Sequence, residues 1–339
     1  MKRNVSLKDI AKEVGVSASL VSYVLNGHAK EKRVSDEIAK KVIETAEKLN
    51  YVPNQIAKSL KTKKSHTIGF IVGEIYYRYT TDTTRVIESV AKANGYTVII
   101  GNSHEDLTTL RELIDVFINR QVDGLIIIAA ENAENEIAYL KKREIPFVLI
   151  DRIYPKIKTN FIGTDNYSVA YKATEYLIEH GRKNIAFVNY ETTFFHLLER
   201  DRGYLTALKD NKLNSDKILH RQIRKSFFEE DMRKAIVELT SNKKTCDAIF
   251  FATDTLSIRG LKNLVQLKVK VPEEIAVFSF DESEAFALFS CPITYYRQPL
   301  EEIGERAANL LFEVMQDIKH IEQISLDSKL FIGQSCGEK

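Results

Sequence analysis

From residue 68 onward, short apolar runs alternate with segments of helical periodicity, and the alternation occurs twice. Continuous apolar strands bounded by helices are typical of a parallel sheet covered on both faces. We therefore predict two doubly wound α/β lobes with a cleft at the carboxyl ends of their strands. The expected strands cover 68–72, 96–101, 123–128, 146–151 and 161–165, then 184–188, 217–223, 248–254 and 275–281; the expected helices cover 82–94, 107–120, 133–143 and 167–180, then 196–211, 229–240 and 256–267.

Residues 6–26, SLKDIAKEVGVSASLVSYVLN, hold two short helical patterns separated by a tight turn. Ser6 can cap the first helix, Gly15 can adopt the positive φ of the turn, and Ser17 can cap the second helix. Two helices of about eight residues joined in this way predict a helix-turn-helix. An ordinary helical hairpin is the alternative that this stretch alone leaves open.

The second helix presents a small polar face, and small residues let a helix approach base edges in the major groove. A polar loop with basic residues follows, and its side chains suit phosphate contacts. A third helix begins after Ser35, which completes an all-α head over residues 1–50. The candidate DNA-contacting residues of this head are Ser6, Ala18, Ser19, Ser22, Tyr23, Asn26, Lys30, Arg33 and Ser35.

Residues 51–65 connect the head to the first α/β lobe, and Asn54 to Leu60 can form two helical turns. Two isolated turns are marginal in water, so we expect this segment to order against a partner. Ala57 and Leu60 share one face with lysines around them, which suits an apolar wedge inserted into the minor groove. A flexible linker with incidental lysines is the alternative.

Charge is distributed unevenly along the 339 residues. Residues 1–64 carry 14 Lys and Arg against 7 Asp and Glu, a net of +7, and the remainder carries 35 against 40, a net of −5. A basic head on an acidic body is typical of a nucleic-acid-binding protein. Three widely spaced cysteines predict neither a disulfide framework nor a metal site, and with no visible signal peptide they indicate a cytoplasmic protein.

Polar residues cluster where the predicted strands end, which is where ligands bind such sheets. Carboxylates, an arginine and aromatic rings there suit a polyhydroxylated ligand, and the candidates are Tyr76, Tyr79, Asp151, Arg152, Phe227, Asp254 and Asp281. Each has a structural alternative. Asp254 and Asp165 can cap the helices that follow them, and the two tyrosines can be core or rim residues.

The sequence lacks the GxSxG, GxxxxGK[ST], GxGxxG and HExxH motifs, and its seven histidines show no metal-ligand spacing. We therefore expect no catalytic residues, cofactor or metal. A solute-binding protein with the same two lobes is the second hypothesis, which the basic head opposes. A cleft enzyme using Asp254 and Asp281 as paired carboxylates is a third and weaker one.

Taken together, the order of these parts resembles the lac repressor/purine repressor family of bacterial transcription regulators over nearly the whole chain. The segments that carry the resemblance include LKDIAKEVGVSASLVSYVLNG, RVSDEIAKKVIETAEKLNYVPNQIAKSLKTKKS, VDGLIII, PFVLIDR, LIEHGRKNIAFV, ERDRGYLTAL, VPEEIAVFSFDE and ITYYRQPLEEIGERAANLL. The resemblance implies a periplasmic-binding-protein-like body over 66–339 and a repressor that acts as a homodimer on a palindromic operator. It also implies a small-molecule effector, most often a sugar or sugar derivative and less often a purine.

The resemblance also assigns roles to individual residues. It places Ala18, Ser19, Ser22 and Tyr23 on the base-reading face, Asn26, Ser35 and Asn54 at backbone-contacting positions, and Leu60 as the wedge. In the effector cleft it adds Arg200, from the RxxG[FY] pattern, to Tyr79, Asp151, Phe227, Asp254 and Asp281. It implies that lobe 1 covers about 66–162 and 296–320, and lobe 2 about 163–293 and 321–339.

The chain departs from the family pattern at three places. The recognition helix reads LVSY where TVSR is common, so Tyr23 replaces an arginine and a bidentate guanine contact is lost there. The loops YYRYTTD and NYETTFFHLLER are unusual, and both line the expected pocket. Thr253 stands where asparagine is common.

Overall fold

The computed structural model describes residues 5–52, 64–213, 219–241 and 246–337. The chain divides into two compact units, Met1–Ser65 and His66–Lys339, which we call the head and the body. Among the described residues, no helix is both long enough and apolar enough to cross a membrane.

The head contains three short helices, α1 (Leu7–Val14), α2 (Ala18–Leu25) and α3 (Asp36–Lys48). Ile10, Val21, Val24, Val42 and Ala46 form its small buried core, with contributions from all three helices. Because this core is small, capping interactions at the helix ends contribute substantially to the stability of the head.

Those signals lie where the sequence predicts them. The backbone amide and the hydroxyl of Ser6 both donate to Asp9 Oδ2, at 2.8 and 2.6 Å. Gly15 has a φ of +80°, which turns the chain between α1 and α2. Ser17 and Ser35 cap α2 and α3, because their hydroxyls accept from the amides of Leu20 and Ile38.

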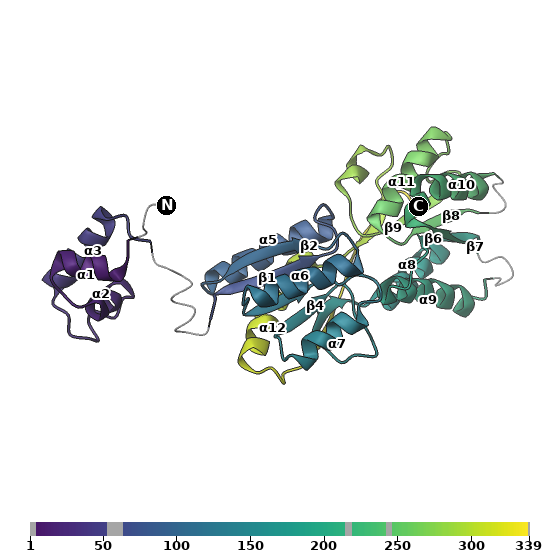
Figure 1. Ribbon diagram of the computed structural model, residues 1–339. Helices are drawn as coiled ribbons and strands as arrows, with labels where there is room; N and C mark the ends of the chain where they lie inside the picture. The colour runs from purple at the N-terminus through teal and green to yellow at the C-terminus, as the bar shows by residue number, and fades with distance from the viewer. Residues whose placement is uncertain (1–4, 53–63, 214–218, 242–245, 338–339) are drawn as a thin grey trace. The chain divides into compact units, whose positions relative to one another are not determined.

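The first lobe of the body is a parallel sheet with the strand order β11-β5-β4-β3-β1-β2. Helices α5 and α12 cover one face, around Phe70, Ile87 and Leu311, and α6 and α7 cover the other, around Ile71 and Leu110 (Figure 1). Neighbouring β1 residues face opposite sides, as a pleated strand requires. The elements are β1 (Thr67–Val72), α5 (Arg78–Ala93), β2 (Thr97–Asn102), α6 (Leu107–Asn119), β3 (Gly124–Ile127), α7 (Glu134–Lys142), β4 (Phe147–Ile150), β5 (Phe161–Thr164), α12 (Leu300–Gln316) and β11 (Gln323–Leu326).

The second lobe repeats this architecture, with the order β12-β10-β9-β8-β6-β7 and an antiparallel β12 at one edge. Phe187, Phe250 and Phe278 pack against one another across its central strands, with tilted and edge-to-face ring contacts. Its elements are α8 (Asn166–Glu179), β6 (Ile185–Tyr190), α9 (Phe195–Asp210), β7 (Leu219–Ile223), η2 (Lys225–Phe227), α10 (Phe228–Thr240), β8 (Ala248–Phe251), α11 (Asp254–Gln266), β9 (Ala276–Phe280), η3 (Glu284–Leu288), β10 (Thr294–Arg297) and β12 (Lys329–Phe331).

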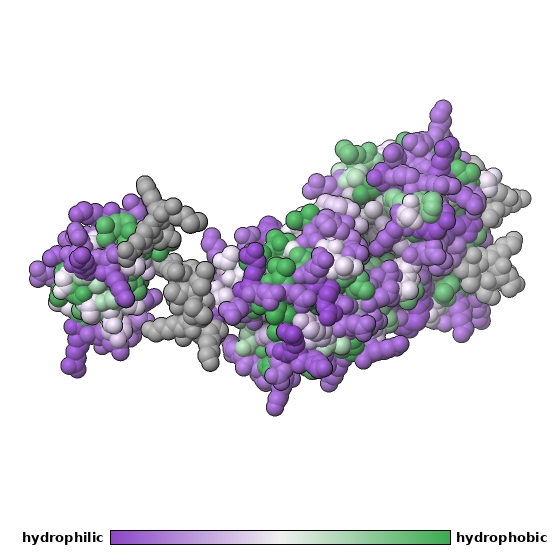
Figure 2. Space-filling model, in the orientation of Figure 1, coloured by the Kyte–Doolittle hydropathy of each residue, from purple (hydrophilic) through white to green (hydrophobic). Residues whose placement is uncertain are grey.

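The chain passes between the lobes three times, and each passage lies a few residues after the expected boundary. Residues 163–164 still belong to β5 of the first lobe, and β10 of the second lobe extends to Arg297. β11 belongs to the sheet of the first lobe, whereas the resemblance implies that residues from 321 onward lie in the second lobe. The short edge strands β11 and β12 contain no buried residues. In β11 exposed and half-buried residues alternate, and in β12 one exposed residue precedes two half-buried ones. The pattern that predicts the central strands therefore does not detect them. Figure 2 shows a mostly hydrophilic surface with small hydrophobic patches.

Candidate functional site

Two groups of described residues are candidates for binding, and the first is the outward face of α2 in the head. Ser19 and Tyr23 are exposed there, and Ala18 and Ser22 are half-buried. The Lys32 ammonium lies 5.5 Å from the centre of the Tyr23 ring. Lys30 and Arg33 are exposed in the loop that follows α2. An aromatic side chain beside cations suits contact with DNA bases and phosphates.

Other predicted DNA-contacting residues of the head have a structural role as well. Ser6 belongs to the start of α1, Ser35 caps α3, and the Asn26 amide donates to the Ser22 carbonyl at 2.7 Å. Asn54, Ala57 and Leu60 lie outside the described residues.

The second group is a polar cluster in the body, with one buried residue and four half-buried ones. Asp151 and Asp281 directly follow β4 and β9, and Asp254 is the first residue of α11 after β8, as the carboxyl-end rule predicts. Arg200 comes from α9 and Tyr79 from α5. We call these five residues the interlobe cluster, because Tyr79 and Asp151 belong to the first lobe and the other three to the second.

Electrostatic coupling shows that the structure brings the interlobe cluster together. Burial lowers the pKa of Arg200, and Asp281, Asp151 and Asp254 oppose that shift. Burial raises the pKa of Tyr79, and the charges of Asp151 and Asp281 add to the rise. The Tyr79 hydroxyl is buried and makes no hydrogen bond with any of the residues that the structure describes. An unsatisfied buried hydroxyl is a binding group for a polar ligand.

Arg200 is the centre of this cluster and is 2% exposed. Its Nε donates to Asn166 Oδ1 at 2.8 Å and its Nη1 to the Ala252 carbonyl at 2.6 Å. The guanidinium carbon lies 3.4 Å from the centre of the Phe280 ring. These contacts fix the planar group in one orientation beside the three aspartates.

Asp281 and Asp151 occupy equivalent places in the two lobes, and both have positive φ, at +70° and +65°. Non-glycine residues seldom adopt this conformation, and it is concentrated at functional sites. Burial raises the pKa of Asp281 to about 7, against the opposing effects of Arg200 and of the Gln298 amide, which donates to both carboxylate oxygens at 3.1 and 2.9 Å. Burial also raises the pKa of Asp151 and Asp254.

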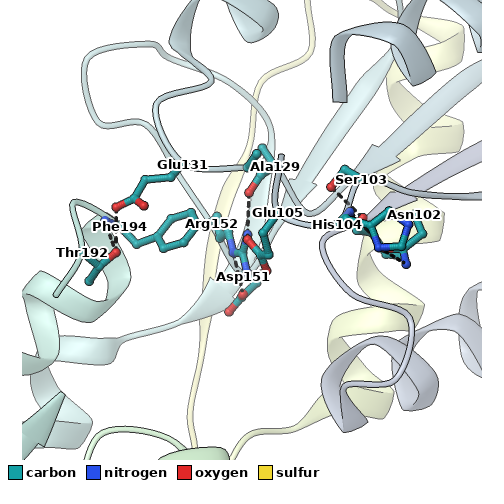
Figure 3. Close-up of polar contacts among 12 residues, drawn as sticks. Asn102, Ser103, His104, Glu105, Ala129, Glu131, Asp151, Arg152, Thr192 and Phe194 are labelled. Atoms are coloured by element: carbon teal, nitrogen blue, oxygen red, sulfur yellow. Dashed lines mark hydrogen bonds and ion pairs between the residues drawn. The ribbon is translucent and has the colours of Figure 1, made fainter. Parts of the chain in front are cut away.

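Arg152, which the sequence predicts as a ligand-binding residue, has extensive partners within the protein (Figure 3). Its two Nη atoms donate to Glu105 at 2.6 Å each, and Nη1 also donates to the Ala129 carbonyl at 2.8 Å. Its guanidinium carbon lies 4.2 Å from the centre of the Phe194 ring, across the lobe boundary. These contacts indicate that Arg152 helps to hold the two lobes together at their boundary. Arg152 also positions Asp151, whose Oδ2 lies 3.4 Å from its Nε.

Two further bridges join the lobes, and no pattern in the sequence predicts either of them. Glu131, after β3, accepts hydrogen bonds from the Thr192 hydroxyl at 2.8 Å and from the Thr193 amide (Figure 3). Burial would raise the pKa of Glu131, but these hydrogen bonds outweigh it and lower that pKa. Arg78 of α5 contacts Glu282 after β9 at 2.7 Å.

The remaining predicted ligand residues are much more exposed than the interlobe cluster. Tyr76 is 70% exposed and packs on Tyr77, and Phe227 is 48% exposed and packs under Arg224. Two aspartates have helix capping as the alternative role. Asp165 does cap α8, because its side chain accepts from the amide of Ser168. The N-cap of α11 is Thr253, so Asp254 is not the capping residue of that helix.

Comparison with known proteins finds a family match for the head and another for the body. Residues 6–54 match the model of bacterial regulatory proteins of the lacI family, and residues 174–336 match a periplasmic binding protein-like domain. The chain is 30% identical over 335 residues to the HTH-type transcriptional repressor PurR of Histophilus somni (strain 2336), covering 97% of this chain and 98% of that protein. It is also 30% identical over 320 residues to catabolite control protein A of Priestia megaterium, covering 92% and 93% of the two chains.

The solved structure of the lac repressor dimer bound to operator and the anti-inducer ONPF has the same fold, with a TM-score of 0.87 at 21% identity, covering 98% of this chain and 99% of that one. A helix-turn-helix head on a two-lobed binding-protein-like body defines a DNA-binding transcriptional regulator that responds to a small molecule. The chain belongs to the lacI family of bacterial regulatory proteins. The predictions of family, fold class and regulatory function are thereby confirmed.

Proposed function

We propose that this regulator is a repressor that binds a palindromic operator as a homodimer in the cytoplasm, under the control of a sugar or sugar derivative bound at the interlobe cluster. The observation that carries the choice of ligand is the composition of that cluster. Three half-buried carboxylates can accept hydrogen bonds, the buried Arg200 guanidinium donates, and the Tyr79 hydroxyl has no hydrogen-bond partner among the described residues. A polyhydroxylated ring presents adjacent hydroxyls that both donate and accept, which complements such a set.

Two proteins of the same fold support a carbohydrate effector. A structure titled as a complex of the transcriptional regulator CelR with cellobiose has a TM-score of 0.71, and a family regulator from Enterococcus faecium was solved with bound ribose, with a TM-score of 0.68. They are 23% and 24% identical to this chain, so they support the kind of ligand and leave its identity open.

The interlobe bridges suggest how the ligand would act. Glu131 with Thr192 and Thr193, and Arg78 with Glu282, hold the two lobes together through exchangeable polar contacts. A ligand that contacts both lobes favours the conformation in which these bridges form, and it shifts the population by its differential affinity. Linkage then requires that DNA binding and effector binding alter each other's affinity by the same factor.

A thermal-shift screen of the full chain against sugars, sugar phosphates and purines tests the effector. We expect a sugar or sugar derivative to raise the melting temperature, because a ligand that binds the folded state stabilises it. The same compound should change the affinity for operator DNA, measured by fluorescence anisotropy. A purine that stabilises the protein while every sugar fails would contradict the proposal.

The wedge role of Leu60 leads to a second prediction. Leu60→Ser should weaken binding to a palindromic operator at least about tenfold and leave nonspecific duplex binding nearly unchanged, because unstacking a base step contributes only at the bent specific site. Both affinities should fall steeply with salt as counterions are released. Equal losses on the two duplexes would exclude the wedge.

Tyr23 should set the operator preference. Tyr23→Arg introduces a bidentate donor for guanine, so we expect a preference of about 1–3 kcal/mol for guanine at one position of each half-site that the parent protein does not show. Binding to a set of duplexes with single base changes measures it. Exposed Lys40 of α3 offers a control, since Lys40→Arg should leave the base preferences unchanged. An unchanged preference profile in Tyr23→Arg would remove this residue from the reading face.

A further inference from the structure

A histidine and two glutamates meet where α12 ends and the chain returns to the first sheet. His320 Nε2 lies 3.4 Å from Glu313 Oε2 and 3.5 Å from Glu322 Oε2. The nearest ligand atoms of all three side chains lie within 4.8 Å of one another. Among the described residues, no other group of three or more His, Cys, Asp or Glu side chains has the spacing of metal ligands.

The two distances from His320 Nε2 match the separation between ligands of one metal ion. With zinc bonds of 2.0–2.2 Å to nitrogen and oxygen, tetrahedral geometry separates neighbouring ligand atoms by about 3.4 Å. The Nε2 atom is shielded from solvent and makes no hydrogen bond within the described part of the chain, although both carboxylates are near. A nitrogen that lies near two carboxylates and forms a hydrogen bond with neither suits a cation placed between the three.

Surrounding contacts hold the ligands in place. Asn160, which is 6% exposed, donates from Nδ2 to the His320 carbonyl at 3.0 Å and accepts from the Glu322 amide through Oδ1 at 2.7 Å. One buried side chain therefore fixes the backbone of two of the ligands. Arg306 lies 3.7 Å from the other oxygen of Glu322, which leaves Oε2 directed toward His320. Such outer contacts orient the ligands of metal sites.

We propose that Glu313, His320 and Glu322 bind a divalent transition metal ion such as Zn²⁺, with water completing the coordination. The imidazole favours zinc and its neighbours in the series over Mg²⁺ and Ca²⁺, which prefer larger sets of oxygen ligands. The ion would join the end of α12 to the start of β11 and so stabilise the edge of the first lobe. This role is independent of the effector at the interlobe cluster.

Calorimetric titration of the full chain with Zn²⁺, after removal of metals with EDTA, tests the site. We expect one saturable site per chain, lost or weakened at least tenfold in His320→Ala and Glu322→Gln. The matched control is His104→Ala, because His104 is an exposed histidine 3.7 Å from Glu74 and so has a single carboxylate as its partner. That variant should bind Zn²⁺ like the parent, and Mg²⁺ should not compete at equal concentration.

A further readout separates metal binding from a structural ion pair. Zn²⁺ should raise the melting temperature of the parent but not of His320→Ala, and in EDTA the two should melt alike. Should His320→Ala fail to fold, Glu313→Gln replaces it, since Glu313 is exposed. Absence of saturable Zn²⁺ binding, or equal binding by the ligand variants, would overturn the proposal.

Discussion

Replacing Arg200 with alanine should lower the free energy of unfolding by about 3–5 kcal/mol, because a buried charged group loses two hydrogen bonds that contribute about 1.5–3 kcal/mol each. The variant loses the hydrogen bonds to Asn166 and Ala252 and the contact with the Phe280 ring. It also leaves Asp151, Asp254 and Asp281 without the cation that opposes their desolvation. Urea unfolding followed by far-UV circular dichroism measures this loss.

The same variant should lose its response to the effector, because the guanidinium is a donor at the centre of the proposed site. Arg202→Ala is the matched control, two residues along the same helix. Arg202 is exposed and pairs with Glu199 at the surface, so its removal should cost less than about 1 kcal/mol and leave the effector response intact. An Arg200→Ala protein as stable and as responsive as the control would contradict the central role of Arg200.

Asp281 should make the body less stable as the pH rises toward neutrality. Burial raises the pKa of this carboxyl to about 7 in the folded chain, whereas an unfolded aspartate titrates near its ordinary value of about 3.9. Between these values the folded state holds the proton and the unfolded state does not. The contribution is therefore fully present below about pH 4, decreases as the pH rises and is lost above about pH 7, at most about 4 kcal/mol in all.

The difference in unfolding free energy between the parent and Asp281→Asn, measured from pH 5 to 7.5, isolates this effect. Asparagine tolerates the positive φ at this position and carries no titrating proton, so the parent should lose stability relative to the variant as the pH rises. Asp231→Asn is the control. Its pairing with Arg224 lowers the pKa of Asp231 to about 2, so its stabilisation is lost as the pH falls toward that value, outside the measured window. A difference that does not change with pH would show that Asp281 is already charged in the folded protein.

Residue patterns predict some of the residues of the site and misassign others. The strand-end rule identifies Asp151, Asp254 and Asp281, because a polar residue directly after a buried strand is visible in the sequence. It also selects Arg152, whose neighbour in sequence is a cluster residue but whose guanidinium contacts Glu105 and Ala129 instead. A local pattern cannot distinguish the two outcomes, because both partners of Arg152 come from segments that follow other strands, β2 and β3.

The sequence by itself determines the local structure of this protein. Apolar periodicity and the capping serines define the three helices of the head, and buried apolar runs define the central strands of both lobes, since these signals act over a few neighbouring residues. Only the tertiary structure places Arg200 among three aspartates, leaves the Tyr79 hydroxyl without a partner and joins Glu131 to Thr192 across the lobes. Those contacts depend on desolvation and on distances between residues far apart in the chain, and neither quantity is recorded in the order of the residues.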